Sequence, residues 1–176
     1  MTTLKELTKL LKEHNIPIHR WKFENGVKTI DNLLNEINSG ETKLVIEDGS
    51  LIRKVKVVNI LVHYKNEILI EDKQVFNNGK TRHRNLNGVS EKVMDNEPVY
   101  NAAFRGLEEE LGIVADYKRL NYINHEKELK MSNSYYGLYS KYDRHIFKYT
   151  MDDNEYKDSY IEEQEDKKTY FKWTTL

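Results

Sequence analysis

The stretch RGLEEELGI, residues 105–113, carries three consecutive glutamates behind one arginine, with a glycine directly after that arginine. Pro98, upstream of it, suits the first turn of a helix, and Gly112 suits the residue that ends one. Between them, apolar residues recur at helical spacing: Val99, Ala102, Ala103, Leu107 and Leu111. The pattern therefore predicts one helix from Pro98 to Gly112.

On this helix, Arg105 and Glu109 lie one turn apart, and Glu109 and Glu110 share one edge. Mg²⁺ is bound through one or two carboxylates and keeps several water ligands for a phosphate substrate. The two glutamates are suitable ligands, and Arg105 would orient one of them. A run of three glutamates also fits a solvated helix face, so this run does not by itself establish a metal site.

The surroundings of the helix resemble the signature of the Nudix hydrolase family, G-x5-E-x7-R-E-U-x-E-E-x-G-U, in which U is a bulky aliphatic residue. The residues that match in register are Glu97, Arg105, Leu107, Glu109, Glu110, Gly112 and Ile113. The small residues before the arginine, Ala102 and Ala103, match the family as well. The signature covers about residues 88 to 113.

Two positions depart from the signature. Glu91 stands where the first glycine should be, and the nearest glycine is Gly88. Either the loop carries three extra residues or another turn replaces the usual one. Gly106 stands where the family has a glutamate that pairs with the arginine, and a glycine there destabilises a helix by about 1 kcal/mol relative to alanine. The site has lost or relocated one carboxylate, and Glu91 is a candidate replacement.

The resemblance implies a hydrolase of nucleoside-diphosphate-linked compounds that needs Mg²⁺ or Mn²⁺. Glu109 and Glu110 would be metal ligands, Glu97 an auxiliary ligand, and Arg105 would orient Glu109. Such an ion neutralises charge on the diphosphate and activates the attacking water. The substrate could be an NDP-sugar, a dinucleoside polyphosphate, ADP-ribose, NADH or an RNA cap.

The family often takes its general base from a late loop, which points here to Glu163, with Glu162 and Glu165 as alternatives. All three could equally be part of a solvated acidic loop. The basic cluster at residues 80–84 would anchor the phosphates through Lys80, Arg82 and Arg84, or simply form a solvated hairpin end.

The composition narrows the function classes. The chain has 28 basic and 29 acidic residues and a formal net charge of −1, which argues against general nucleic-acid binding. The lack of cysteine excludes thiolate metal sites and disagrees with the isopentenyl-diphosphate isomerase branch of the same fold. Without an apolar run of about 18 residues or a secretory h-region, we expect a cytoplasmic protein that does not enter the membrane.

Residues 1–53 are predicted to form an N-terminal extension of two helices, at 3–14 and 28–40, and a hairpin around Asp48-Gly49. The apolar stripes of the helices should be buried against the domain itself or in a homodimer.

Residues 54–176 are predicted to form a Nudix domain of the α+β class, with a mixed sheet sandwiched between helices. Strands are expected at 54–64, 66–72, 73–76 and 81–90, and again after the helix. The acidic segment 152–166 is predicted to be a loop before a last strand at 169–173. The retained carboxylates favour an enzyme, and Gly106 favours the alternative, a Nudix-fold binding module for a nucleotide-like ligand or a protein.

Overall fold

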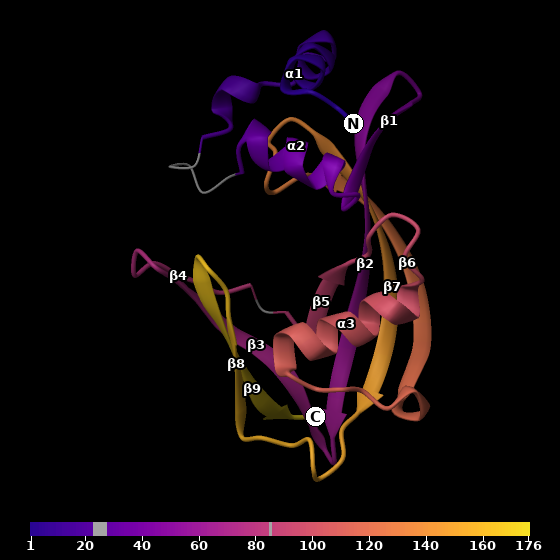
Figure 1. Cartoon of the computed structure of the whole chain (residues 1–176), viewed down its shortest axis with the longest axis vertical. Coiled ribbons are helices and arrows are strands. Elements are labelled where there is room, and N and C mark those ends of the chain that lie inside the picture. The colour runs from indigo at the N-terminus through magenta and orange to yellow at the C-terminus, as the bar shows by residue number, and fades with distance from the viewer. Residues whose placement is uncertain (23–27, 85) are drawn as a thin grey trace. The chain divides into compact units, whose positions relative to one another are not determined.

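A computed structural model describes residues 1–22, 28–84 and 86–176 and has an α+β fold (Figure 1). The α-helices of this part of the chain are α1 (Leu4–Glu13), α2 (Ile30–Asn38) and α3 (Val99–Leu111), with short 3₁₀ turns at Ile18–Arg20 and Tyr117–Arg119. The strands are β1 (Thr42–Glu47), β2 (Ser50–Tyr64), β3 (Glu67–Phe76), β4 (Thr81–Arg82), β5 (Val89–Lys92), β6 (Leu120–Met131), β7 (Tyr139–Thr150), β8 (Ser159–Glu163) and β9 (Lys167–Thr175). The predicted α+β class with a mixed sheet is confirmed.

The described strands join one sheet in the order β6-β7-β2-β3-β9-β8, with β1 and β5 paired to β2 and β4 paired to β3. The chain divides into two compact units. The first unit contains Met1–Val57, Lys92–Glu97 and Glu126–Arg144, and the second contains Val58–Glu91, Pro98–His125 and His145–Leu176. The boundary at residue 53 and the homodimer stay predictions. Within the described residues, every helix is too short or too polar to cross a bilayer.

The first unit contains both predicted N-terminal helices and the predicted hairpin. The Thr3 side chain caps α1 by accepting a hydrogen bond from the Glu6 backbone N–H at 3.2 Å. Asp48 and Gly49, at φ 49° and 79°, form the tight turn between β1 and β2. Most apolar residues of both helices are buried or partly buried within this unit, whereas Leu4 is exposed. The buried cluster consists of Leu7, Leu11, Trp21, Leu33, Leu51, Tyr135 and Leu138.

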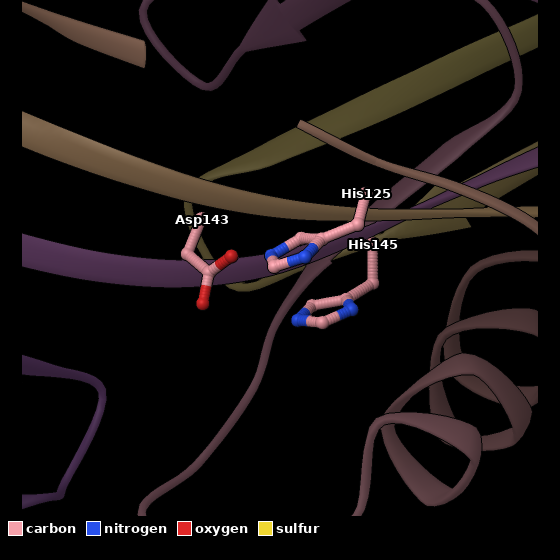
Figure 2. Close-up of side chains that lie close together, drawn as sticks. All are labelled: His125, Asp143 and His145. Atoms are coloured by element: carbon pink, nitrogen blue, oxygen red, sulfur yellow. The ribbon is translucent and has the colours of Figure 1, made fainter. Parts of the chain in front are cut away.

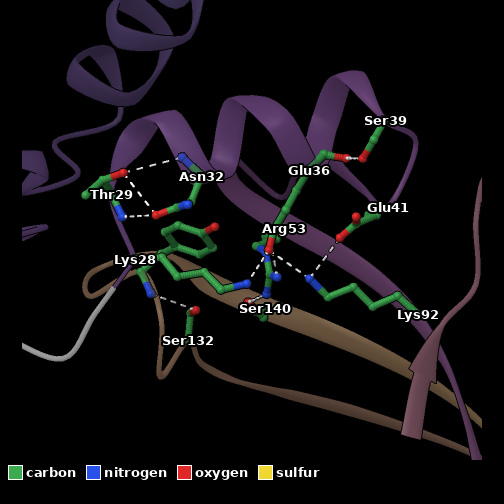
Figure 3. A network of polar contacts seen from close by, with 11 residues as sticks. Lys28, Thr29, Asn32, Glu36, Ser39, Glu41, Arg53, Lys92, Ser132 and Ser140 are labelled. Atoms are coloured by element: carbon green, nitrogen blue, oxygen red, sulfur yellow. Dashed lines mark hydrogen bonds and ion pairs between the residues drawn. The ribbon is translucent and has the colours of Figure 1, made fainter. Parts of the chain in front are cut away.

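A buried carboxylate, Glu36 on α2, lies at the centre of a charged network in the first unit (Figure 3). Its oxygens lie 2.6 Å from Lys28 Nζ, 2.7 Å from Lys92 Nζ and 3.2 Å from a terminal guanidinium nitrogen of Arg53. Burial alone would raise the pKa of Glu36, but Arg53, Lys92 and Lys28 together lower it to about 2. This network joins α2 to β2, to β5 and to Lys28, two residues before the helix.

In the second unit, α3 has the bounds that its pattern predicts. Gly112 ends it in the left-handed conformation at φ 70°. One face of the helix is buried and consists of Ala102, Ala103, Gly106, Leu107 and Leu111. Glu108 and Glu109 lie outside this face and are exposed, whereas Glu110 is only partly exposed because it follows the buried Gly106 by one helical turn.

Four predictions about strands and loops were wrong. The hairpin arm and the following strand form one continuous strand, β2, and the two strands expected over 66–76 also form one, β3. Of residues 81–90, only Thr81–Arg82 and the start of β5 are strands. The segment expected to be an acidic loop contains β8, which pairs antiparallel with β9 through Ile161 and Tyr170. Its charges are tolerated because an edge strand exposes side chains to solvent.

Candidate active site

The arginine and two of the glutamates of the predicted site lie together along α3. The terminal nitrogen Nη1 of Arg105 lies 3.6 Å from Oε2 of Glu109, one helical turn later. Glu109 is about half exposed, whereas Glu110 is more buried than either of its glutamate neighbours. The helix therefore offers one solvated carboxylate, oriented by an arginine, and one carboxylate that is partly removed from water.

Glu110 lies among other carboxylates of the second unit. Burial, together with the negative charges of Glu162 and Glu91, raises the pKa of Glu110 to about 9, against the opposing charge of Arg84. The pKa of Glu162 is also raised, first by its own burial and then by Glu91. A positive charge beside these groups would counteract the effect of their negative neighbours and favour the carboxylate forms.

The strand β8 decides which of the late glutamates joins this group. Neighbouring residues of a strand point to opposite faces of the sheet. Glu162 has Glu91 and Glu109 as charged neighbours. Glu163 is 72% exposed and lies 3.5 Å from the ammonium of Lys168. The structure therefore brings Glu162, and not the predicted Glu163, to the carboxylates of α3, and Glu165 follows beyond the end of β8.

The two departures from the signature lie close to each other in the second unit. Gly88 is at φ 67° beside β2, and a Cβ atom there would collide with the carbonyl oxygen of Ile60, so the chain requires glycine at this position. Glu91, on β5, lies near α3, and its Oε1 is 3.1 Å from Nη1 of Arg105. A Cβ atom on Gly106 would lie 3.1 Å from the Cβ of Glu91.

The predicted phosphate-binding arginines are engaged with partners inside the second unit. Arg84 donates through Nε to Oε2 of Glu71 at 2.9 Å and makes a second contact with Oε1 of the same carboxylate. Arg82 donates to Oε1 of Gln74 through Nε at 2.9 Å. Lys80, directly before β4, is exposed. A phosphate would meet Arg84 as a member of an ion pair rather than as an isolated cation.

Glu71 is a residue of this site that the sequence reasoning missed. It is only 5% exposed, lies on β3 and adds to the negative charge that Glu110 experiences. A signal was present, because Glu71 directly follows the apolar run at residues 68–70 within the same predicted strand. Its partner, Arg84, lies just after β4, and only the structure shows that the two side chains are in contact.

Glu97, the predicted auxiliary ligand, belongs to the first unit. Its Oε1 accepts a hydrogen bond from the backbone N–H of Met94 at 3.1 Å, which holds the turn before α3. Its role toward a metal stays a prediction.

Two histidines of the second unit stack on each other on neighbouring strands (Figure 2). The ring centroids of His125 on β6 and His145 on β7 are 4.3 Å apart, and the rings are inclined by 10°. Nδ1 of His145 lies 2.8 Å from the hydroxyl oxygen of Tyr122. Figure 2 also draws Asp143, which precedes His145 by two residues on β7 and belongs to the first unit.

The donor set near α3 fits a hard divalent cation. Glu91, Glu109, Glu110 and Glu162 offer only carboxylate oxygens, which are the ligands that Mg²⁺ and Mn²⁺ prefer. Burial and the neighbouring carboxylates raise the pKa of Glu110, and a cation bound beside it would stabilise its negative charge. These residues could hold the ion that the signature implies.

No protein-family model matches the sequence, and no curated protein matches it significantly. Among solved structures, the chain is similar to the MutT protein of Bacillus halodurans, with 18% identity over 55% of this chain and 56% of that one, at a TM-score of 0.38. DR0079 from Deinococcus radiodurans is 19% identical over 69% of this chain and 67% of that one, at a TM-score of 0.42. The dihydroneopterin triphosphate pyrophosphohydrolase of E. coli is 12% identical over 69% of this chain and 79% of that one, at a TM-score of 0.45.

All three are Nudix hydrolases. The likeness concerns the fold alone. The chain spans just over half the length of the Bacillus halodurans protein.

Proposed function

We propose that this chain is a Mg²⁺- or Mn²⁺-dependent hydrolase of a diphosphate compound, of the kind in which a nucleoside diphosphate is linked to another group. The observation that carries the proposal is the grouping on α3. Glu109 lies beside Arg105, and Glu110 lies partly buried among Glu162 and Glu91. A helix edge that served only for solubility would have no use for a half-buried carboxylate surrounded by others.

In this proposal, Glu109 and Glu110 hold the ion and Arg105 keeps the Glu109 carboxylate in place. A bound Mg²⁺ or Mn²⁺ would neutralise charge on the diphosphate and lower the pKa of an attacking water. Glu162 accepts the proton of that water, because it faces the α3 carboxylates whereas Glu163 faces Lys168. A base with a raised pKa retains more affinity for a proton near neutral pH than an ordinary carboxylate does.

The basic cluster would meet the substrate phosphates beside the ion. Arg84 is already oriented by its two contacts with Glu71, so it can present its remaining N–H groups without losing much side-chain freedom. Lys80 is exposed and would act as a flexible point charge, while the Arg82 side chain is hydrogen-bonded to Gln74.

The test is hydrolysis of a panel of diphosphate compounds with Mg²⁺ or Mn²⁺, with the products separated by anion-exchange chromatography. We expect turnover by the wild type that falls at least about 100-fold in Glu110→Gln and Glu109→Gln, the range that removal of a charge-stabilising group covers. Glu108→Gln is the matched control, because Glu108 is an exposed glutamate of the same helix. Absence of turnover by the wild type over the whole panel would contradict the proposal and favour the binding module.

A further inference from the structure

Gly106 and Glu91 lie against each other in the second unit, although they are on different elements. Gly106 is on the buried face of α3, and Glu91 is on the short strand β5. A Cβ atom built on Gly106 would lie 3.1 Å from the Cβ and 3.6 Å from the Cγ of Glu91, and 3.5 Å from a methyl of Val89. Side-chain atoms rarely approach one another so closely, so a glutamate at position 106 would compete with the Glu91 side chain for the same space.

Glu91 also supplies the partner that the helix lacks. In the signature, a glutamate directly after the arginine pairs with that arginine, and here that position is Gly106. The guanidinium of Arg105 instead lies 3.1 Å from Oε1 of Glu91, nearer than the 3.6 Å to Glu109. Both residues of this pair are largely screened from solvent, at 28% and 21% side-chain exposure. An ion pair held in this way is oriented more firmly than one at the surface.

We propose that Glu91 replaces the missing signature glutamate. The carboxylate that the signature places on α3, at position 106, is supplied here from β5, and the glycine has moved in the opposite direction. Glu91 is then a positioning residue. It holds Arg105, which in turn orients Glu109, and it adds a negative charge beside Glu110 that increases the attraction for a divalent cation. This inference rests on the proposed function. In it, Gly106 leaves space for the Glu91 side chain and is not the sign of a lost site.

The exchange has a sharp test, because it can be reversed. The double variant E91G/G106E moves the carboxylate back to the helix and removes the Cβ at position 91. Free Mn²⁺ can be measured by its electron paramagnetic resonance signal during titration of the full-length protein, which reports metal affinity without any substrate. The set comprises wild type, Glu91→Gln, Glu91→Gly, Gly106→Glu, the double variant and Glu108→Gln, each with a thermal melt to verify folding.

We expect Glu91→Gln and Glu91→Gly to weaken Mn²⁺ binding about 10- to 100-fold, as loss of a residue that orients a ligand does. Glu108→Gln should bind like the wild type. The double variant should return to within roughly threefold of wild-type affinity, although each of its single changes weakens binding, and such recovery is not expected of a purely structural contact.

Two outcomes would overturn the inference alone: wild-type affinity in a folded Glu91→Gln, or no recovery in a folded double variant. Glu91→Gln keeps the shape of the side chain, so it decides the matter even if the double variant does not fold. A wild type that binds no Mn²⁺ would overturn the proposed function and this inference with it.

Discussion

At the scale of a single residue, the effect of Gly106 on stability depends on a neighbour outside its own helix. In isolation it weakens α3 by about 1 kcal/mol relative to alanine. In the folded protein glycine is favoured at this position, because the Cβ of Glu91 lies where a larger residue would need space. The local penalty is therefore offset by a tertiary contact, and the same position that looks like a damaged signature is adapted to a charged neighbour.

Gly106→Ala tests this balance through stability. We expect the change to lower the free energy of unfolding by about 1 kcal/mol, because the cost of overpacking exceeds the gain in helix propensity. In a Glu91→Gly background the same change should raise it by a similar amount. Urea unfolding followed by circular dichroism measures both, and a Gly106→Ala variant that is more stable than the wild type would contradict the argument.

At the scale of elements, β8 decides the chemistry of the late acidic segment. Its pairing with β9 places Glu163 opposite Lys168 and Glu162 opposite Thr169. Because side chains alternate along a strand, the two neighbouring glutamates belong to different faces. In a flexible loop, either Glu162 or Glu163 could approach α3, whereas in the strand only Glu162 lies on the face toward it.

The two glutamates can therefore be separated by experiment. We expect Glu162→Gln to lower kcat by about 100-fold or more, in the range typical of a lost general base, with the acidic limb of the pH–rate profile changed. Glu163→Gln should keep kcat within roughly twofold. The measurement is kcat against pH on the preferred diphosphate compound, and the reverse pattern would return the base to Glu163.

At the scale of the whole molecule, charged contacts join segments that are far apart in the chain. Glu36 on α2 contacts Lys28, Arg53 and Lys92, which lie before α2, on β2 and at the end of β5 (Figure 3). The Arg53 guanidinium also donates to the hydroxyl of Ser140 on β7 at 3.2 Å. The first unit is assembled from three stretches of sequence, and this network crosses between all of them.

This network predicts a stability that depends on pH. The pKa of Glu36 falls from 4.5 to about 2 on folding, so its contribution is fully present above pH 4.5 and is lost as the pH falls toward 2. The contribution is roughly 3 kcal/mol. Urea unfolding between pH 7 and pH 3 should show this loss, and Glu36→Gln should reduce it.

Glu36→Gln should also be less stable at pH 7 by about 3 to 5 kcal/mol, because Arg53 would then be a buried charge without its counter-charge. Retention of the full pH dependence in this variant would show that other carboxylates are responsible for it.

The sequence by itself was sufficient for features whose cause is local. The helix from Pro98 to Gly112, the helices at 3–14 and 28–40 and the Asp48-Gly49 turn all follow from periodicity and from residues that suit particular backbone angles. The spacing of Arg105, Glu109 and Glu110 follows from the helix as well.

The tertiary structure decided everything that depends on which segments become neighbours. The selection of Glu162 required β9 beside β8, and the engagement of Arg84 required Glu71 on β3. The contact of Glu91 with Gly106 required β5 against α3. Strand pairing and burial bring together residues that are distant in sequence, and no local pattern encodes these distances. Helix periodicity could therefore show where the carboxylates lie along α3, and only the folded sheet could show which other charges surround them.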